Sequence, residues 1–518
     1  MSGPTERPVR LHSARDPLKE ARRYVSSLTD LRGSRVVVVT EPAESFLASA
    51  LREMLPNARI VAVRYGDALF RESDSLWDAV WRPGLGIPLS AFLFAILPDE
   101  LLPQTAFVPW KPSDEYWPRE ASSVWREIAA LLRTQRSVLQ TRVHFGPRWL
   151  ANSVRNAILA DRVVRDEEIR VPTVITASGP SLDRLFPFPE RDSFLLIALS
   201  SSLTAILARG ITPDICVTTD GGYWANRHVA IIPPDVPIAF PLEAALPSRV
   251  IASNPLLVLD YGSPLERALF IVRGISGAAT EQSGTVAGTA ALFALSRSDR
   301  EVFAAGLDLA PGSARAHCTP HAFDGIIEAS SSRSYPLSQN LYERSGSSAA
   351  LEVYHRWFSS RGGEFSRRFF RINPAQPCLG GIREADRAMV ERAARESTSP
   401  AGRPSYSGAM QKKPQGLVSD WLRACSEAFR DRVRVRAVAE FAVRGVSGTA
   451  GSAGTAGSAG ITDPTDVAVL ADMLKLVSFR EYLSLLRSDP ERWIVPEGIS
   501  GYLDGLYRKA KVLEGGKA

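Results

Sequence analysis

Short apolar runs alternate with amphipathic stretches through the first part of the chain. The run "SRVVVVTEP" predicts a strand near residues 35–40, and "ARIVAVRYG" predicts a second strand within residues 58–66. Helical spacing in "ESFLASALREML" predicts a helix between them, and "SAFLFAILP", residues 90–98, predicts a third strand. The turn after the first strand is acidic and lacks the spacing GxGxxG. We therefore expect a Rossmann-like domain that has no dinucleotide site there.

A second alternating segment follows a long helical pattern. The stretches "SSVWREIAALLRTQRSVLQTRVHF" and "PRWLANSVRNAILADRVV" both have helical spacing. Beyond them, apolar runs predict strands, and helical stretches such as "TVAGTAALFALSR" separate some of these runs. The predicted strands begin near Thr173, Phe194, Asp214, Val236, Leu256 and Glu301. This alternation predicts a mostly parallel sheet with helices on both faces.

The pattern as a whole predicts an α/β protein of several domains. We expect an N-terminal α/β, Rossmann-like domain over residues 1–120 and a Rossmann-like central domain with a mostly parallel sheet over residues 121–385. Residues 386–415 are rich in Pro, Ser and Gly at "STSPAGRPSYSGAMQKKPQG" and are expected to form a linker or surface loop. A helical domain should occupy residues 416–518, interrupted at residues 448–460 by a tandem Gly/Ser/Ala repeat that is expected to be flexible.

Composition narrows the class of protein only slightly. A chain of 518 residues is too long for one core, and its net charge of +6 does not separate an acidic small ligand from RNA. The four cysteines show no CxxC spacing, which disfavours structural zinc and a secreted disulfide scaffold. The N-terminus lacks an apolar signal segment, and the longest apolar run, residues 87–97, is too short to cross a bilayer. We therefore expect a cytoplasmic protein without membrane insertion.

Two turns made of small residues adjoin predicted strands or helices in the central domain. They are Ser178, Gly179, Pro180 and Ser181 after the first strand, and Ser283, Gly284 and Thr285 before an alanine-rich helix. Gly179 permits a close backbone approach, and Pro180 suits the first turn of a helix. Helix N-termini expose N–H groups that bind anions such as phosphate. Ordinary helix capping accounts for either turn alone, but two such turns on one sheet favour a phosphate site.

Four further side chains are expected at or just after the carboxyl ends of strands. Asp220 follows the strand "DICVTT" and is suited to accept hydrogen bonds from a sugar or to hold a divalent ion, although an isolated Asp-Gly-Gly by itself favours an Asp that caps its own turn. Asp308 ends "EVFAAGLD", and His317 and His321 follow it. A histidine here could act as a general base or pair with a leaving phosphate. No further Cys/His set surrounds the His-x3-His spacing, so the metal remains unknown. Other side chains able to contact a base, sugar or phosphate are Tyr223, Trp224, Arg315, Tyr335 and Tyr342.

These motifs together resemble a known family. The stretches "FGPRWLANSVRNAIL", "VPTVITASGPSLDRL", "GITPDICVTTDGG", "SGTVAGTAALFAL" and "VFAAGLDLA" are similar to those of the motility-associated (Maf) flagellin glycosylation factors. The central domain of that family is similar to bacterial sialyltransferases and to the archaeal MptE-like hydroxymethylpterin diphosphokinase. The resemblance covers residues 146–382, close to half of the chain, and includes Trp149, Asn152 and Asn156 in the helix that enters the domain. The flanking regions agree with the family layout without a sharp motif.

The resemblance implies transfer of a nonulosonic acid, of the pseudaminic or legionaminic type, from a CMP-sugar to Ser or Thr of flagellin. It implies no further cofactor and no nucleic-acid partner, and it allows magnesium without requiring it. The residues carried over are Gly179, Pro180 and Ser181 lining the CMP-sugar cleft, Asp220 facing the nucleotide or sugar, Ser283, Gly284 and Thr285 holding phosphate or the sugar carboxylate, and Asp308 and His317 beside them. Thr285 stands where the family often has Ser, and the His-rich stretch of residues 315–321 leaves the identity of the base open.

Two other functions stay open at this point. One is a diphosphokinase that acts on a small heterocycle with ATP and magnesium, with Asp220 or Asp308 as metal ligands. The long flanking domains favour a protein acceptor over a small metabolite. The other is a non-catalytic flagellin-binding or assembly factor, which the retained Ser, Asp and His side chains disfavour.

Overall fold

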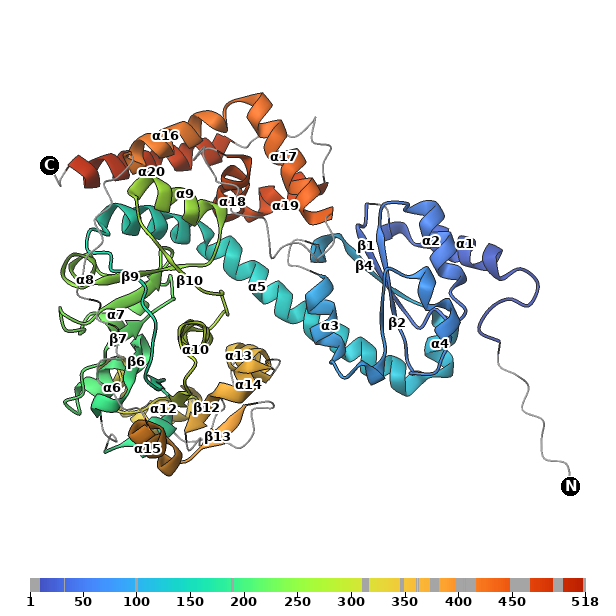
Figure 1. Ribbon diagram of the computed structural model, residues 1–518. Coiled ribbons are helices and arrows are strands. Elements are labelled where there is room, and N and C mark those ends of the chain that lie inside the picture. The colour runs from blue at the N-terminus through green and yellow to red at the C-terminus, as the bar shows by residue number, and fades with distance from the viewer. Residues whose placement is uncertain are drawn as a thin grey trace, which may run out of the picture. The chain divides into compact units, whose positions relative to one another are not determined.

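The computed structural model describes residues 10–31, 33–97, 101–187, 191–309, 316–344, 349–359, 361, 363–372, 382–396, 404, 406, 416–447, 466–487 and 497–515. The chain divides into two compact units. The first comprises Met1–Arg142, Ala442–Gly457 and Tyr482–Trp493, and the second comprises Val143–Phe441, Ser458–Glu481 and Ile494–Ala518. Figure 1 traces the chain through both units, with the N-terminal sheet in blue and the central sheet running from green to orange.

The N-terminal unit contains a parallel four-stranded sheet with the strand order β3-β2-β1-β4. Alternate residues of β1 point to opposite faces: Val37 and Val39 belong to one core cluster, and Val36 and Val38 belong to another. Both faces are therefore covered, which is why the strands are continuous apolar runs rather than alternating ones. The elements are β1 Val36–Thr40, β2 Arg59–Val63, β3 Ala79–Trp81, β4 Thr105–Pro109, α1 Pro17–Ser27, α2 Phe46–Met54, α3 Leu89–Ile96 and α4 Lys111–Tyr116.

One sequence-based prediction in this unit was wrong. The apolar run at residues 90–98, expected to be a strand, forms most of helix α3. The run is apolar on every side, so its periodicity does not separate a strand from a buried helix. Leu89 and Leu93, one helical turn apart, are both fully buried in the same cluster. The remaining strands of the sheet are β3 and β4, which the sequence pattern did not reveal.

A buried arginine fills the turn that follows β1. Arg64 Nη1 donates to Glu41 Oε1 at 3.0 Å and to the Ala43 carbonyl oxygen at 2.7 Å, while Nη2 donates to Ser45 Oγ at 3.0 Å. Glu41, Ala43 and Ser45 have positive φ angles of 36°, 50° and 68°. Left-handed backbone costs a non-glycine residue roughly 1–2 kcal/mol. The hydrogen bonds from the guanidinium therefore stabilise a strained turn.

The second unit contains a nine-stranded sheet in which every pair is parallel. Each of the six strands predicted for the central domain is present. The strands are β5 Thr173–Thr176, β6 Leu195–Leu199, β7 Ile215–Val217, β8 Ile238–Pro241, β9 Leu256–Asp260, β10 Ala278–Ala279, β11 Val302–Ala305, β12 Phe369–Ile372 and β13 Arg383–Ala385. The predicted fold class, an α/β protein with mostly parallel sheets, is confirmed.

The strand order places a topological switch point beside the first strand of this sheet. The order is β10-β9-β8-β7-β6-β5-β11-β12-β13, so the chain builds outward from β5 in one direction and then returns to its other side at β11. β5 pairs with β11 in the register Thr173↔Val302 to Thr176↔Ala305. The loops after β5 and β11 therefore run in opposite directions, and a crevice forms between them at the carboxyl ends of the strands. Parallel sheets bind ligands in such crevices.

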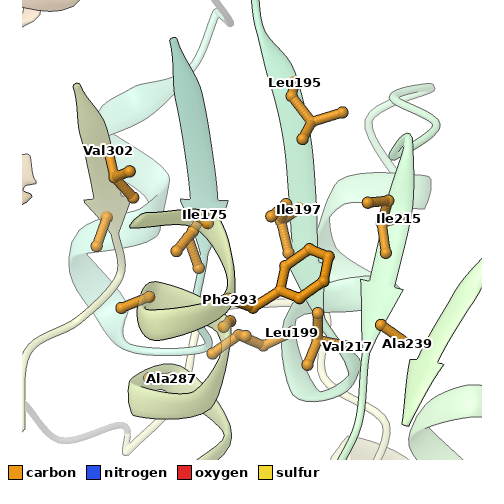
Figure 2. Packing of buried hydrophobic residues seen from close by; sticks show 14 of the residues in the cluster. Ile175, Leu195, Ile197, Leu199, Ile215, Val217, Ala239, Ala287, Phe293 and Val302 are labelled. Atoms are coloured by element: carbon orange, nitrogen blue, oxygen red, sulfur yellow. The ribbon is translucent and has the colours of Figure 1, made fainter. Parts of the chain in front are cut away.

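An alanine-rich helix lies on the face of the central sheet. In α10, Val286–Arg297, the side chains of Ala290, Ala291, Phe293 and Ala294 are fully buried. Figure 2 shows Phe293 in one cluster with Ile197 and other aliphatic side chains of the strands. The small alanines allow the helix to approach the sheet closely, while the single large ring fills the space between strands.

Further helices of this unit connect or follow its strands along the chain. They are α6 Leu203–Leu207, α7 Ala225–Val229, α8 Ser248–Ser253, α9 Pro264–Arg273, α11 Asp324–Ala329, α12 Leu337–Arg344, α13 Ala349–Ser359, α14 Glu364–Arg368 and α15 Arg387–Glu396. Helix α15 has Val390 and Ala394 buried and lies inside the range expected to be a linker. The predicted boundaries of the domains stay predictions, and the repeat at residues 448–460 lies outside the described residues.

The predicted helical C-terminal region is present. It contains α16 Val418–Ala428, α17 Arg432–Ser447, α18 Val467–Val477, α19 Phe479–Arg487 and α20 Glu497–Gly515. Helices α16 and α18 pack on α9, and α16 packs on α20. The long helix α5, Pro118–Leu159, also joins this packing: the Tyr502 hydroxyl donates to the Pro147 carbonyl oxygen. Within the described ranges, no helix combines the length and the apolar character needed to cross a bilayer.

Candidate active site

The loop after β5 is held tightly against the end of β11. The Gly179 N–H donates to the Gly306 carbonyl oxygen at 2.8 Å. A Cβ on Gly179 would lie 2.4 Å from that oxygen and 2.4 Å from Asp308 Oδ2. Glycine is therefore required here because the two loops meet with no room for a side chain, and this contact lies at the switch point between β5 and β11.

The helix expected after this loop is shorter and tighter than the sequence indicates. Residues Pro180–Leu185 form a 3₁₀ helix, η5, rather than an α-helix. Asp308 Oδ2 accepts a hydrogen bond from the Ser181 N–H at 2.8 Å, and Asp308 is 6% exposed. A carboxylate of the protein thus accepts the hydrogen bond from the N–H group that was expected to bind phosphate. The ligand contacts predicted for Pro180, Ser181 and Asp308 stay predictions, and the geometry gives Asp308 a role in positioning the loop.

His317 lies against the same loop. Its Nδ1 is 3.3 Å from Ser178 Oγ, and the N–H of the next residue, Cys318, donates to the Ser178 carbonyl oxygen at 2.7 Å. The imidazole is partly open to solvent. Burial of the remainder of the ring nevertheless lowers the pKa of His317, although Asp324 and Ser178 act in the opposite direction. A neutral imidazole next to solvent is a suitable proton acceptor.

Two more histidines extend this arrangement into a cluster. The rings of His317 and His321 are stacked with centroids 4.3 Å apart, and His228 lies 5.3 Å from His321. Burial lowers the pKa of His321 to about 3, and the neighbouring histidines contribute to the shift. Burial and His317 also lower the pKa of His228. The sequence analysis named His317 and His321 as candidate bases and missed His228, although three of the six histidines in the chain meet here.

Asp220 lies at the carboxyl end of β7 and is exposed. Its Oδ1 accepts from the Gly222 N–H at 2.7 Å, which is the turn-capping arrangement that the sequence left open. Its negative charge raises the pKa of His228 and so opposes the effect of burial there. Asp220 is therefore coupled to the histidine cluster through His228, and its predicted contact with a sugar or nucleotide stays a prediction.

The end of helix α5 supports the loops around Asp220. Asn152 Nδ2 donates to the carbonyl oxygens of Gly221 and Glu243 at 3.2 and 2.9 Å. Asn156 Nδ2 donates in the same way to Leu242 and Ala244 at 2.8 and 2.7 Å. The indole of Trp149 lies against Gly221, where a Cβ would approach it to 2.3 Å. The three residues that carry the family resemblance in this helix thus position the loops that follow β7 and β8.

The second small-residue turn lies at the same edge of the sheet. Helix α10 begins after Thr285, and Figure 2 shows Ala287 near Leu199 at the carboxyl end of β6. Ser283 Oγ donates to the Thr285 carbonyl oxygen at 2.7 Å and lies 3.1 Å from Thr289 Oγ1, while Gly284 has a φ of +73°. The Thr285 side chain makes no capping bond. In the described part of the chain, no hydrogen bond joins this turn to the loop at Ser178, so its role in binding an anion stays a prediction.

Two other features of the described residues do not indicate a second site. In the ranges that the structure describes, no three His, Cys, Asp or Glu side chains are grouped in a way that could hold a metal ion. A hollow of about 630 Å³ in the N-terminal unit is lined in part by Asp74 and Arg82. These two side chains pair with each other at 2.6 Å. These two charges in the hollow are thus paired with each other. The switch point of the central sheet is therefore the stronger candidate for a ligand site.

Comparison with known proteins supports the same region. Residues 148–312 match the family described as 6-hydroxymethylpterin diphosphokinase MptE-like. This confirms the predicted similarity of the central domain to that family. Ser178, Asp220 and Asp308 lie inside the matched segment, and His317 lies just beyond it.

Two further relatives are more distant or partial. A Treponema pallidum (strain Nichols) protein, described as uncharacterized, is 37% identical over 289 residues, which are 55% of this chain and 64% of the relative. This chain therefore spans just under two thirds of that relative's length. A solved structure titled "Structure of MAf glycosyltransferase from Magnetospirillum magneticum AMB-1" covers 99% of this chain and 84% of its own, with 13% identity and a TM-score of 0.42. A likeness of this degree carries no argument about fold or function.

Proposed function

We propose that this protein is a glycosyltransferase that moves a nonulosonic acid from a CMP-sugar to Ser or Thr of flagellin. One observation carries the proposal: Ser178, Asp308 and His317 converge at the β5/β11 switch point, which is where parallel sheets bind ligands. The sequence motifs that resemble the flagellin glycosylation factors supply the substrate class. The reaction would take place in the cytoplasm, with flagellin as the protein partner and no nucleic acid or membrane insertion.

The reaction assigns a task to each group. The bond between the anomeric carbon and the phosphate oxygen breaks, CMP leaves with the electron pair, and positive charge grows on the sugar ring. The acceptor hydroxyl oxygen bonds to the anomeric carbon, and its proton goes to the neutral imidazole of His317. Hydroxyl and N–H groups at Ser178 and at the Ser283–Thr285 turn would stabilise the departing phosphate. Asp220 would accept hydrogen bonds from sugar hydroxyls.

The donor already carries a good leaving group, so the proposed reaction requires no cofactor beyond the CMP-sugar. Magnesium is allowed. Asp220, whose Oδ1 caps a turn and whose side chain is exposed, is the carboxylate best suited to approach an ion bound to the donor. Asp308 is less suited because it is only 6% exposed and its Oδ2 accepts from the Ser181 N–H.

The MptE-like match favours a second candidate, a diphosphokinase that uses ATP and magnesium on a small heterocycle. This function would use the same crevice, and the phosphoryl groups would need a metal held by Asp220 or Asp308. A non-catalytic flagellin-binding factor is the third candidate, and the solvent-accessible imidazole of His317, 3.3 Å from Ser178 Oγ, argues against it.

A transfer assay separates these functions. Purified protein would be incubated with flagellin and CMP-pseudaminic or CMP-legionaminic acid, and intact flagellin would be weighed by mass spectrometry. We expect a mass gain equal to the sugar with one of the donors, and a higher melting temperature with CMP than with ATP and magnesium. Stabilisation by ATP with magnesium and none by CMP would favour the kinase. Loss of the flagellin glycan in cells lacking the gene, restored by the wild-type gene and not by His317→Gln, would exclude the non-catalytic factor.

A further inference from the structure

Two large aromatic side chains are exposed next to the proposed site. Tyr223 and Trp224 are 67% and 56% exposed, although exposed rings of this size cost free energy in water. They follow Asp220 after two intervening glycines. The centroids of their rings lie 5.7 Å apart in an edge-to-face arrangement. The adjoining helix α7 is anchored by Ala225 and Val229, which are buried. The indole is thus an exposed flat surface on a fixed backbone.

A row of ring contacts connects Trp224 to the switch point. Phe323 packs edge-on against Trp224 at 6.1 Å and lies 5.5 Å from His321. His321 stacks on His317, and His317 reaches Ser178. The indole therefore belongs to one continuous wall that begins at the loop after β5.

Two ring nitrogens in this wall lack a protein partner. His321 is 5% exposed, and its Nε2 makes no hydrogen bond to any described residue; the same holds for His228 Nδ1. Buried polar atoms are usually satisfied, so these two nitrogens leave unused hydrogen-bonding capacity in the wall. Neutral imidazoles and an exposed indole suit a flat heteroaromatic ring better than a charged group.

We propose that Trp224 is the stacking surface for the nucleobase of the donor, which is a cytosine under the proposed function on which this inference rests. Ser178 and Trp224 stand at opposite ends of this row of contacts, as the phosphate and the base do in a nucleoside monophosphate. Ser178 would then be nearest the phosphate and Trp224 nearest the base, and the exposed carboxylate of Asp220 would accept from the ribose hydroxyls. The guanidinium carbon of Arg227 lies 5.7 Å from the centroid of the Trp224 ring, and this cation–π contact helps to hold the indole in place.

The test compares CMP with a ligand that lacks the base. The dissociation constants of CMP and of ribose 5-phosphate would be measured by calorimetry on the full chain for the wild type, Trp224→Ala and Trp224→Phe. The matched control is Phe441→Ala, another exposed aromatic residue of the same unit, on α17. Trp224→Ala should weaken CMP roughly 5- to 100-fold, the effect of removing a stacking aromatic side chain. Trp224→Phe should retain most of the affinity, and the control should match the wild type.

Ribose 5-phosphate should bind the wild type and Trp224→Ala equally, however weakly. CMP should quench the tryptophan fluorescence of the wild type, and this quenching should be absent in Trp224→Phe. If CMP binds the wild type and Trp224→Ala alike, or if Trp224→Ala weakens both ligands to the same degree, the inference is wrong while the proposed function stands. If the wild type binds no CMP at all, both are overturned.

Discussion

Ser178 Oγ and His317 Nδ1 lie 3.3 Å apart, although 139 residues separate them in the chain. The hydrogen bond from the Cys318 N–H to the Ser178 carbonyl oxygen fixes the two backbones side by side. Because β11 returns to the side of β5 opposite β6, the segment after β11 lies over the loop after β5. A hydroxyl and a neutral imidazole thus share the position where a ligand is expected.

The imidazole of His317 should control the pH dependence of transfer. Burial lowers its pKa below the ordinary value of about 6.5, so the neutral form persists at neutral pH. We expect kcat/KM to be constant near pH 7 and to fall with acidification only below about pH 6.5, as His317 gains a proton. His317→Gln should lower kcat roughly 100- to 10,000-fold. A variant that keeps the wild-type rate and pH profile would remove His317 from the reaction.

Asp220 should be needed for activity and not for folding. Its side chain is exposed and accepts one hydrogen bond, from Gly222 N–H. Asp220→Ala should abolish sugar addition to flagellin and cost about 1 kcal/mol of the free energy of unfolding, the usual value for one hydrogen bond. Asp220→Asn keeps an acceptor oxygen for Gly222 and should restore stability without restoring transfer. Full activity in either variant, measured by flagellin mass, would place Asp220 outside the site.

Gly179 should tolerate no side chain. An added Cβ would meet the Gly306 carbonyl oxygen and Asp308 Oδ2 at 2.4 Å, so Gly179→Ala must displace one of the two loops. We expect a loss of about 1–3 kcal/mol in urea unfolding, together with weaker CMP binding. Gly325→Ala is the matched control because nothing lies within 4 Å of its Cβ and it sits in a helix, where alanine stabilises by up to about 1 kcal/mol. Equal stability of the two variants would contradict the close loop contact.

His321 should make the protein less stable as the pH falls. Its pKa is about 3 in the folded state and near 6.5 when unfolded, so below pH 6.5 the unfolded chain binds a proton that the folded chain excludes. The free energy of unfolding should fall through this window, by up to about 2 kcal/mol from this residue between pH 7 and pH 5. His321→Phe should show a shallower fall than the wild type in urea titrations at the two pH values. His144→Gln, a change at an exposed histidine of α5, should behave like the wild type, and an unchanged slope in His321→Phe would contradict the burial effect.

Much of the sheet was predictable because its strands are buried on both faces. Residues 173–176 and 195–199 are continuous aliphatic or β-branched runs, and both form strands of the parallel sheet. Apolar character alone did not distinguish residues 90–98, where the same pattern belongs to helix α3. Strands as short as β10, with two residues, carry too few positions to show any pattern.

The sequence by itself determined the α/β class, the small-residue turn at Ser178–Ser181 and the residue types that gather at the carboxyl edge, since these depend on local backbone preference and burial. Only the tertiary structure decided their partners. In the structure the Ser181 N–H donates to Asp308, and residues after Gly179 form a 3₁₀ helix where an α-helix was expected. His228 also lies beside the two histidines that follow β11. Those contacts depend on strand order, which places β11 beside β5, and strand order is set by packing between residues far apart in the chain.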